Sequence, residues 1–201
     1  MKDIFQQIYE GNMWGGTESV SGPGSSVEAT EEIIKKLPIL IKSFHIKTVL
    51  DAPCGDFNWM KLVNLDIEQY FGVDIVSELI EKNNHYYSNH QRKFLYLDIT
   101  SEPLPAVDLI ICRDCLVHFS FQNIWQTLNN FKRSSSKYLL TTTFTEHPTN
   151  KDIKTGDWRH LNLQKEPFIF PKPLYIIKEK PYADKSLALW WLDSLKFKGS
   201  E

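Results

Sequence analysis

Three aspartates stand where short apolar runs of the sequence end, and this placement is the first sign of chemistry. Asp51, Asp74 and Asp98 each follow a run of apolar or aromatic residues that is typical of a buried strand. The runs are residues 48–50, 70–73 and 94–97. Ligands of open α/β sheets bind beyond the carboxyl ends of the strands, so three acids at these positions predict a ligand site.

The turn after the first run suits a ligand that comes close to the backbone. It reads Asp51-Ala52-Pro53-Cys54-Gly55-Asp56-Phe57 and contains a single glycine. A dinucleotide would press its pyrophosphate against such a turn and would need the full Gly-x-Gly-x-x-Gly pattern. The glycine-poor turn therefore argues against NAD. Asp74 stands further along at a position from which a carboxylate can accept hydrogen bonds from two ribose hydroxyls.

Four segments, taken in order, resemble the motifs of class I S-adenosylmethionine-dependent methyltransferases. The segments are residues 49–59, 72–75, 97–99 and 108–119, and the resemblance spans about residues 47–145. The first segment departs from the usual glycine-rich turn, because Pro53 and Phe57 stand where glycines are common. The resemblance implies S-adenosylmethionine as the cofactor, and this molecule has no phosphate that would require the missing glycines.

The resemblance also implies which residues hold the cofactor. Asp74 would bind the ribose, Asp98 the adenine amino group, and the backbone after Asp98 a ring nitrogen. In the N-terminal loop, free amides at a helix start would attract the methionine carboxylate. A simple capped loop is the alternative there, and Trp14 is equally well placed to be a core anchor. The predicted set is Trp14, Ser21, Gly22, Ser25, Asp51, Pro53, Gly55, Asp74, Ile75, Asp98, Ile99 and Arg113.

The acceptor side is predicted from the segment that follows the fourth apolar run. His118 is the first candidate for a general base, since the unperturbed pKa of histidine lies near neutrality. Asp114 and His160 are the other candidates, and a packed structural histidine is an equal alternative for His118. An irregular loop further on is expected to bind the acceptor, an ordinary solvated loop being its alternative. The predicted acceptor-binding residues are Asp157, Trp158 and Arg159.

Alternating strands and helices predict the fold that positions these residues. Further strands are expected at 107–111, 138–143, 174–177 and 187–192, the last two as a hairpin at one sheet edge. Helices are expected at about 3–10, 26–44, 57–63, 77–87 and 121–131. We expect an α/β, Rossmann-like class I methyltransferase fold. It would have a mostly parallel seven-stranded sheet, helices on both faces and an N-terminal helical extension.

The length of 201 residues suits one domain. We expect a single methyltransferase domain over residues 1–201, with N-terminal helices and a cofactor-covering loop in 1–45 and the Rossmann-like core in 46–201. Ser25 and Glu28 fit a capping box at the start of the second helix. Pro38 is expected to kink or divide that helix.

Composition narrows the partners and the compartment. A net charge of −2 without a dense run of Lys or Arg argues against nucleic acid. No apolar run approaches the roughly 20 residues that span a bilayer, and the N-terminus lacks a signal-peptide core, so we expect a cytoplasmic protein without a membrane partner. Cys54, Cys112 and Cys115 are expected to be free thiols, and without a clear metal-ligand cluster we expect a metal-independent reaction.

These features predict a reaction class and leave its acceptor open. We expect transfer of the methyl group of S-adenosylmethionine to a small-molecule or glycan acceptor, with a hydroxyl as the accepting group. A protein or RNA methyltransferase would share every cofactor residue, and an inactive cofactor-binding module is a further alternative. A nucleotide-dependent oxidoreductase is disfavoured by the missing glycines.

Overall fold

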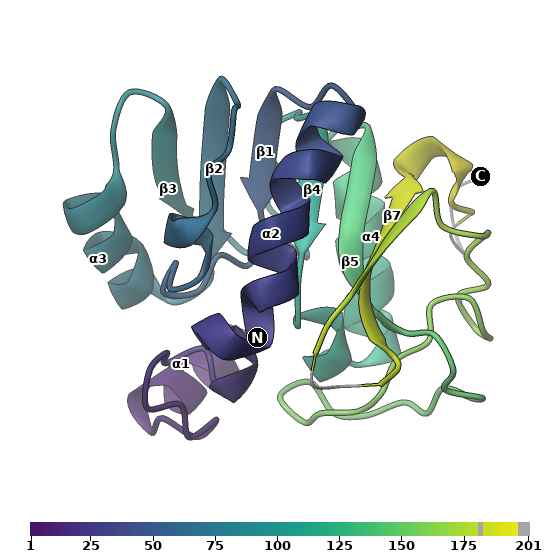
Figure 1. Cartoon of the computed structure of the whole chain (residues 1–201). Coiled ribbons are helices and arrows are strands. Elements are labelled where there is room, and N and C mark those ends of the chain that lie inside the picture. Colours follow the sequence, from purple (N-terminus) through teal and green to yellow (C-terminus); the bar gives the residue numbers. More distant parts are fainter. Residues whose placement is uncertain (181–182, 197–201) are drawn as a thin grey trace.

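A computed structural model describes residues 1–180 and 183–196 of the chain. Its centre is a seven-stranded sheet in the order β3-β2-β1-β4-β5-β7-β6 (Figure 1). The strands are β1 Thr48–Asp51, β2 Gln69–Asp74, β3 Arg92–Tyr96, β4 Leu109–Cys112, β5 Tyr138–Phe144, β6 Tyr175–Lys178 and β7 Lys185–Trp191. Strands β1 to β5 pair in parallel, whereas β7 runs antiparallel to β5 and β6. The predicted mostly parallel sheet is confirmed.

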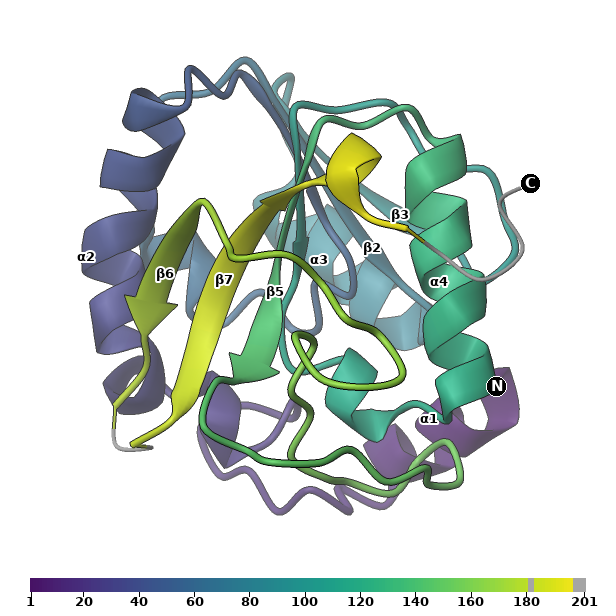
Figure 2. The same cartoon turned by 90° about the vertical axis from the view of Figure 1, so that its right-hand side faces the viewer.

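Helices cover both faces of this sheet. The α-helices are α1 Lys2–Glu10, α2 Val27–Ser43, α3 Ser77–Tyr87 and α4 Phe121–Arg133. Short 3-10 turns occur at η1 Pro23–Ser25, η2 Met60–Leu62, η3 Leu116–His118 and η4 Leu192–Ser194. Figure 2 shows α2 on one side of the sheet and α4 on the other. Among the described residues, no helix has the length and apolar character needed to cross a membrane.

The central strands contribute to two separate cores. Val49 of β1 packs with the buried face of α2, which includes Leu37, whereas the next residue, Leu50, packs with Leu128 of α4. Strand β4 divides its apolar side chains between the two cores in the same way. Successive side chains of a strand point to opposite faces, so a strand covered on both sides must be apolar throughout. This explains why these strands are visible in the sequence as continuous apolar runs.

The predicted helix over residues 57–63 is wrong. Phe57 adopts a left-handed backbone conformation with φ of 58°, which an α-helix does not accommodate, and the short turn η2 is all that follows. The Phe57 ring packs instead against Tyr70 and Phe94, with centroid distances of 5.4 and 5.2 Å. An aromatic cluster therefore takes the place of the expected helix.

Two expectations about α2 also need correction. Of the two outcomes expected at Pro38, division of the helix is wrong, because α2 runs unbroken from Val27 to Ser43 with Pro38 inside it. The helix is capped by Ser26 rather than Ser25, and the Ser26 hydroxyl accepts a hydrogen bond from the N–H of Ala29 at 3.2 Å. Ser25 instead ends the turn η1, one residue before the cap.

The N-terminal segment lies next to the site predicted from the strand ends. Figure 1 shows α1 and the loop that follows it beyond the carboxyl ends of β1 to β4. This loop, residues 11–26, leads directly into α2. The fold therefore brings the N-terminal segment and the strand-end acids to the same edge of the sheet.

Candidate active site

A cavity of about 430 Å³ lies at the carboxyl edge of the sheet, in the size range of small-molecule sites. Asp114, His118 and Trp158 line it together with every residue that was predicted to bind the cofactor. These cofactor candidates are Trp14, Ser21, Gly22, Ser25, Asp51, Pro53, Gly55, Asp74, Ile75, Asp98, Ile99 and Arg113. The structure thus brings together residues as far apart in the sequence as Trp14 and Trp158.

Asp74 is fixed in this cavity by two backbone amides. Its carboxylate accepts hydrogen bonds from the N–H groups of Gly55 and Val76, each at 3.0 Å. Gly55 makes this approach with φ of 54°, a conformation that glycine adopts without strain. Burial raises the pKa of Asp74 to about 6, and the amide hydrogen bonds oppose the rise. The carboxylate is therefore mostly ionised in neutral solution.

Asp51 and Asp98 occupy different environments. Burial raises the pKa of Asp51 to about 7, while a hydrogen bond from the Tyr70 hydroxyl, 2.6 Å from Asp51 Oδ2, opposes the rise. Asp98 is only partly buried. It follows the strand less directly than predicted, because β3 ends at Tyr96 rather than at Leu97.

The acidic end of the cavity, formed by Asp51, Asp74 and Asp98, carries uncompensated charge. Among the described residues, none of the three acids forms an ion pair. A buried carboxylate without a cation disfavours an anionic ligand. The acidic end therefore suits a ligand that brings positive charge together with hydroxyl or amino donors.

Asp56 attaches the N-terminal loop to this end of the sheet, and the sequence analysis missed it. Its carboxylate accepts hydrogen bonds from the Ser19 hydroxyl and from the N–H of Val20, both at 3.0 Å. Gly22 follows with φ of 89°, close to the side chain of Trp14. The sequence did contain a signal for this role. An acid stands directly after the glycine of the first turn, where its carboxylate can accept hydrogen bonds from backbone amides.

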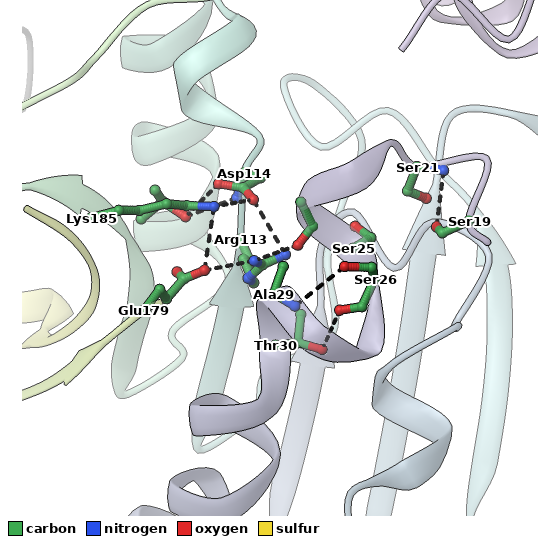
Figure 3. A network of polar contacts seen from close by, with 12 residues as sticks. Ser19, Ser21, Ser25, Ser26, Ala29, Thr30, Arg113, Asp114, Glu179 and Lys185 are labelled. Atoms are coloured by element: carbon green, nitrogen blue, oxygen red, sulfur yellow. Dashed lines mark hydrogen bonds and ion pairs between the residues drawn. The ribbon is translucent and has the colours of Figure 1, made fainter. Parts of the chain in front are cut away.

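A cluster of four charged side chains lies where β4 and the β6–β7 hairpin meet the start of α2 (Figure 3). Arg113 reaches Glu179 at 2.6 Å and Asp114 at 3.2 Å, and Lys185 reaches Asp114 at 2.6 Å and Glu179 at 3.3 Å. Arg113 also donates to the carbonyl of Gly24 at 2.7 Å. We call these four side chains the ion-pair cluster. It contains two positive and two negative groups, and the sequence analysis missed Glu179 and Lys185.

His118 ends η3 at the edge of the cavity. Its Nδ1 lies 3.0 Å from the backbone carbonyl oxygen of Asp157, and its ring centroid lies 5.0 Å from that of Trp14. A carbonyl can only accept, so Nδ1 carries the proton and Nε2 is left as the ring's acceptor. Burial lowers the pKa of His118, and the Asp157 carbonyl opposes this effect. The ring is therefore neutral at neutral pH.

Only part of the loop that was predicted to bind the acceptor lines the cavity. Trp158 lines the cavity, whereas Asp157, Arg159 and His160 are not among the residues that line it. The Arg159 guanidinium is buried and donates to the carbonyls of η3, at 3.1 Å to Leu116. Through these bonds from Nη1 it supports the segment that carries His118, while its Nε and Nη2 have no hydrogen-bond partner among the described residues. His160 packs outside, with its ring centroid 4.4 Å from that of Phe144.

The three cysteines are free and buried in the structure. Cys54 and Cys115 line the cavity, and Cys112 lies in the core at the end of β4. Within residues 1–180 and 183–196, no group of three or more His, Cys, Asp or Glu side chains is arranged to hold a metal ion. Cys112 is therefore a core residue, and Cys115 is part of the cavity wall.

Comparison with known proteins gives the class of protein. Residues 50–137, somewhat under half of the chain, match a family model described as a methyltransferase domain. A search of curated protein sequences gave no match. Solved structures give a broader likeness, although at low identity.

Three of these structures illustrate the likeness. Magnesium protoporphyrin IX methyltransferase from Synechocystis PCC 6803, with bound S-adenosylmethionine, is 11% identical, with a TM-score of 0.61 over 94% of this chain and 96% of that one. A Leishmania major S-adenosylmethionine-dependent methyltransferase is 13% identical, with a TM-score of 0.66 over 93% and 83%. The methyltransferase domain of bacterial CtHen1 is 15% identical, with a TM-score of 0.51 over 57% and 66%.

Residues 50–137 thus match a methyltransferase domain, and the chain has the fold of the class I S-adenosylmethionine-dependent methyltransferases. The acidic end of the cavity fits this cofactor, whose sulfonium and ammonium groups are cations and whose ribose and adenine carry donors. At Gly55 the Ser21 side chain leaves no space for a Cβ, so the N-terminal loop packs directly on the first turn.

Proposed function

We propose that this chain methylates a hydroxyl of a small-molecule or glycan acceptor, with His118 as the general base. S-adenosylmethionine supplies an electrophilic methyl group and leaves as a neutral thioether that needs no acid. The protein's own residues must therefore align the acceptor and take its proton. The cavity places His118 and the acidic end in one continuous space.

The acidic end would hold the cofactor. Asp74 is the proposed partner of the ribose hydroxyls, since its two backbone hydrogen bonds fix the carboxylate and leave lone pairs available. Asp98 and Ile99 are the proposed partners of the adenine. The loop residues Ser21 and Ser25 line the same cavity and are the proposed partners of the methionine carboxylate. The remaining proposed cofactor residues are Trp14, Gly22, Asp51, Pro53, Gly55, Ile75 and Arg113.

The orientation of the His118 ring is the observation that carries the proposal. The Asp157 carbonyl accepts from Nδ1, so the basic nitrogen is Nε2, and burial keeps the ring neutral. A neutral imidazole with a fixed tautomer is ready to accept a proton from a hydroxyl. Arg159 contributes indirectly, because it holds the carbonyls of the η3 segment in place.

The rival candidates for the base are less well prepared. Burial opposes the ionisation of Asp114, yet the charges of Arg113 and Lys185 hold its pKa below the usual value. Such a carboxylate is a weak base. His160 is not among the residues that line the cavity, but its ring packs against Phe144 and Trp158, which do, so the exposed His90 is the matched control for His118.

The test is turnover of isotope-labelled S-adenosylmethionine against fractionated metabolites, followed by kinetics with the acceptor so identified. His118→Ala should lower turnover by about a hundred- to ten-thousandfold, the usual contribution of general-base catalysis. Cofactor affinity should stay nearly unchanged, and His90→Ala should retain turnover. The rate of the unmodified protein should fall as pH drops through the lowered pKa of His118, because protonation removes the base.

Two outcomes would contradict this role. If His118→Ala keeps most of its turnover with the true acceptor, the base lies elsewhere, and Asp114 is the next residue to test. If His118→Ala loses cofactor binding instead, the histidine is a structural residue of η3.

A further inference from the structure

Part of the cavity lining is rich in aromatic side chains. We call it the aromatic end, and its members are Phe5, Trp14, Phe119, Phe144 and Trp158. His118 belongs to the same region, because its ring lies against Trp14. The proposed base therefore lies among aromatic rings, whereas the proposed cofactor residues are mostly acids and residues that offer backbone groups.

The rings of the aromatic end support one another. The Phe5 centroid lies 6.3 Å from that of Trp14 and 5.8 Å from that of Phe119. Trp158 lies 6.1 Å from Phe144 at an interplanar angle of 86°. These separations are typical of attractive aromatic pairs. Trp158 is nevertheless 54% exposed, so a large part of this ring is open to a ligand.

The charged side chains beside the aromatic end are already paired with oppositely charged neighbours. Asp114 and Lys185 line the cavity, and each is in ion-pair contact within the cluster. Because the cluster holds two positive and two negative groups, it offers no net charge to an acceptor. An anionic or cationic acceptor would have to break these contacts to gain a charged partner from the cluster.

A polyhydroxyl acceptor also fits poorly. A sugar buried in the cavity needs a hydrogen-bond partner for each hydroxyl, since every unpaired hydroxyl weakens binding. No Asn or Gln side chain is among the described residues that line the cavity. The side-chain partners near the aromatic end are few: His118, which one hydroxyl would use, the single indole donors of Trp14 and Trp158, the Tyr9 hydroxyl, which accepts from Lys82, and side chains that are engaged in the ion-pair cluster.

We infer that the acceptor is a flat, uncharged aromatic compound with a hydroxyl group, and that Trp158 is the surface on which it stacks. This inference rests on the proposed methyl transfer. The hydroxyl oxygen forms the new bond to the methyl carbon, the cofactor sulfur keeps the electron pair of the broken bond, and the hydroxyl proton passes to Nε2 of His118. The acceptor ring would stay at the aromatic end throughout.

Three matched probes test the inference by equilibrium binding. Calorimetry compares 2-naphthol, its saturated counterpart decahydro-2-naphthol, and a methyl glucoside, each titrated into protein saturated with S-adenosylhomocysteine. We expect 2-naphthol to bind about tenfold more tightly than the other two. Trp158→Ala should weaken 2-naphthol binding by about tenfold, because the stacking surface is lost. Trp191→Ala is the control, since this exposed tryptophan of β7 is not among the cavity-lining residues.

The outcomes separate this inference from the function on which it rests. If S-adenosylhomocysteine binds but 2-naphthol has no advantage over decahydro-2-naphthol, the aromatic acceptor is overturned and methyl transfer stands. Tighter binding of the methyl glucoside, or equal effects of Trp158→Ala and Trp191→Ala, would also overturn it. If S-adenosylhomocysteine does not bind, the proposed function fails and the aromatic acceptor fails with it.

Discussion

The acidic end of the cavity and the ion-pair cluster both contain buried charged side chains, but these side chains are stabilised by different kinds of partner. At the acidic end, Asp51 is bonded by a tyrosine hydroxyl and Asp74 by two backbone amides. In the ion-pair cluster, each side chain has an oppositely charged neighbour within 3.3 Å. The first region therefore keeps an excess of negative charge, whereas the second is balanced.

This difference indicates different roles. Unbalanced buried charge costs stability in the ligand-free protein, and a cationic ligand with hydroxyl donors removes part of that cost. The ion-pair cluster connects β4, the β6–β7 hairpin and the segment before α2, so it holds parts of the fold together. Three predictions test this division between binding and stability, from the largest expected effect to the smallest.

Glu179→Ala should destabilise the fold strongly. The substitution leaves the buried Arg113 and Lys185 without one of their carboxylates, and breaking a buried ion pair costs several kcal/mol. Asp114 remains as a partner, so we expect a loss of about 3 kcal/mol, at the lower end of that range. Urea unfolding measures it, with Glu31→Ala at an exposed pair on α2 as the control. A loss no larger than in the control would mean that the cluster does not stabilise the fold.

Asp74→Ala should act on binding instead. A hydrogen bond to a charged group is worth about 1.5–3 kcal/mol, so the affinity for S-adenosylmethionine should fall by about ten- to a hundredfold. Calorimetry on the folded variant checks this, with the exposed Asp66→Ala as the matched control. Unchanged affinity in a folded Asp74→Ala protein would refute the ribose assignment.

Asp51→Asn should show a stability gain that depends on pH. The folded-state pKa of Asp51 is raised to about 7, so between about pH 4 and 7 the folded protein keeps a proton that the unfolded chain has lost. Wild-type stability therefore falls relative to Asp51→Asn as pH rises through this window, and the difference levels off above it. We expect about 1–2 kcal/mol between pH 6 and pH 8, since one unit of pKa corresponds to about 1.4 kcal/mol and the window closes near pH 7.

Urea unfolding of both ligand-free proteins at the two pH values measures this difference. A difference that stays constant with pH would mean that burial does not raise the pKa of Asp51.

The acidic end was predictable because its signal is local. Asp51, Asp74 and Asp98 each follow a buried strand closely, and the parallel sheet then brings the strand ends together. The strands were visible for the same reason, since burial on both faces requires continuous apolar runs. The helix expected at 57–63 failed because tertiary packing of the Phe57 ring, with its left-handed backbone, overrides helical spacing.

The ion-pair cluster and the loop after β5 were less predictable, because their contacts are distant in the sequence. Glu179 lies 66 positions from Arg113, and no local pattern indicates which charges will meet across that distance. The sequence also does not say which way a side chain of an irregular loop turns. Arg159 was expected to face an acceptor but is bonded to the backbone of η3, whereas its neighbour Trp158 lines the cavity.

Titration with three adenosine-containing ligands tests the central claim most directly. The account holds that the acidic end, with its glycine-poor first turn, binds S-adenosylmethionine and does not bind a dinucleotide. Calorimetry should show saturable binding of S-adenosylmethionine and S-adenosylhomocysteine, and no binding of NAD, to the same protein. Measurable NAD binding without binding of S-adenosylmethionine would contradict the account.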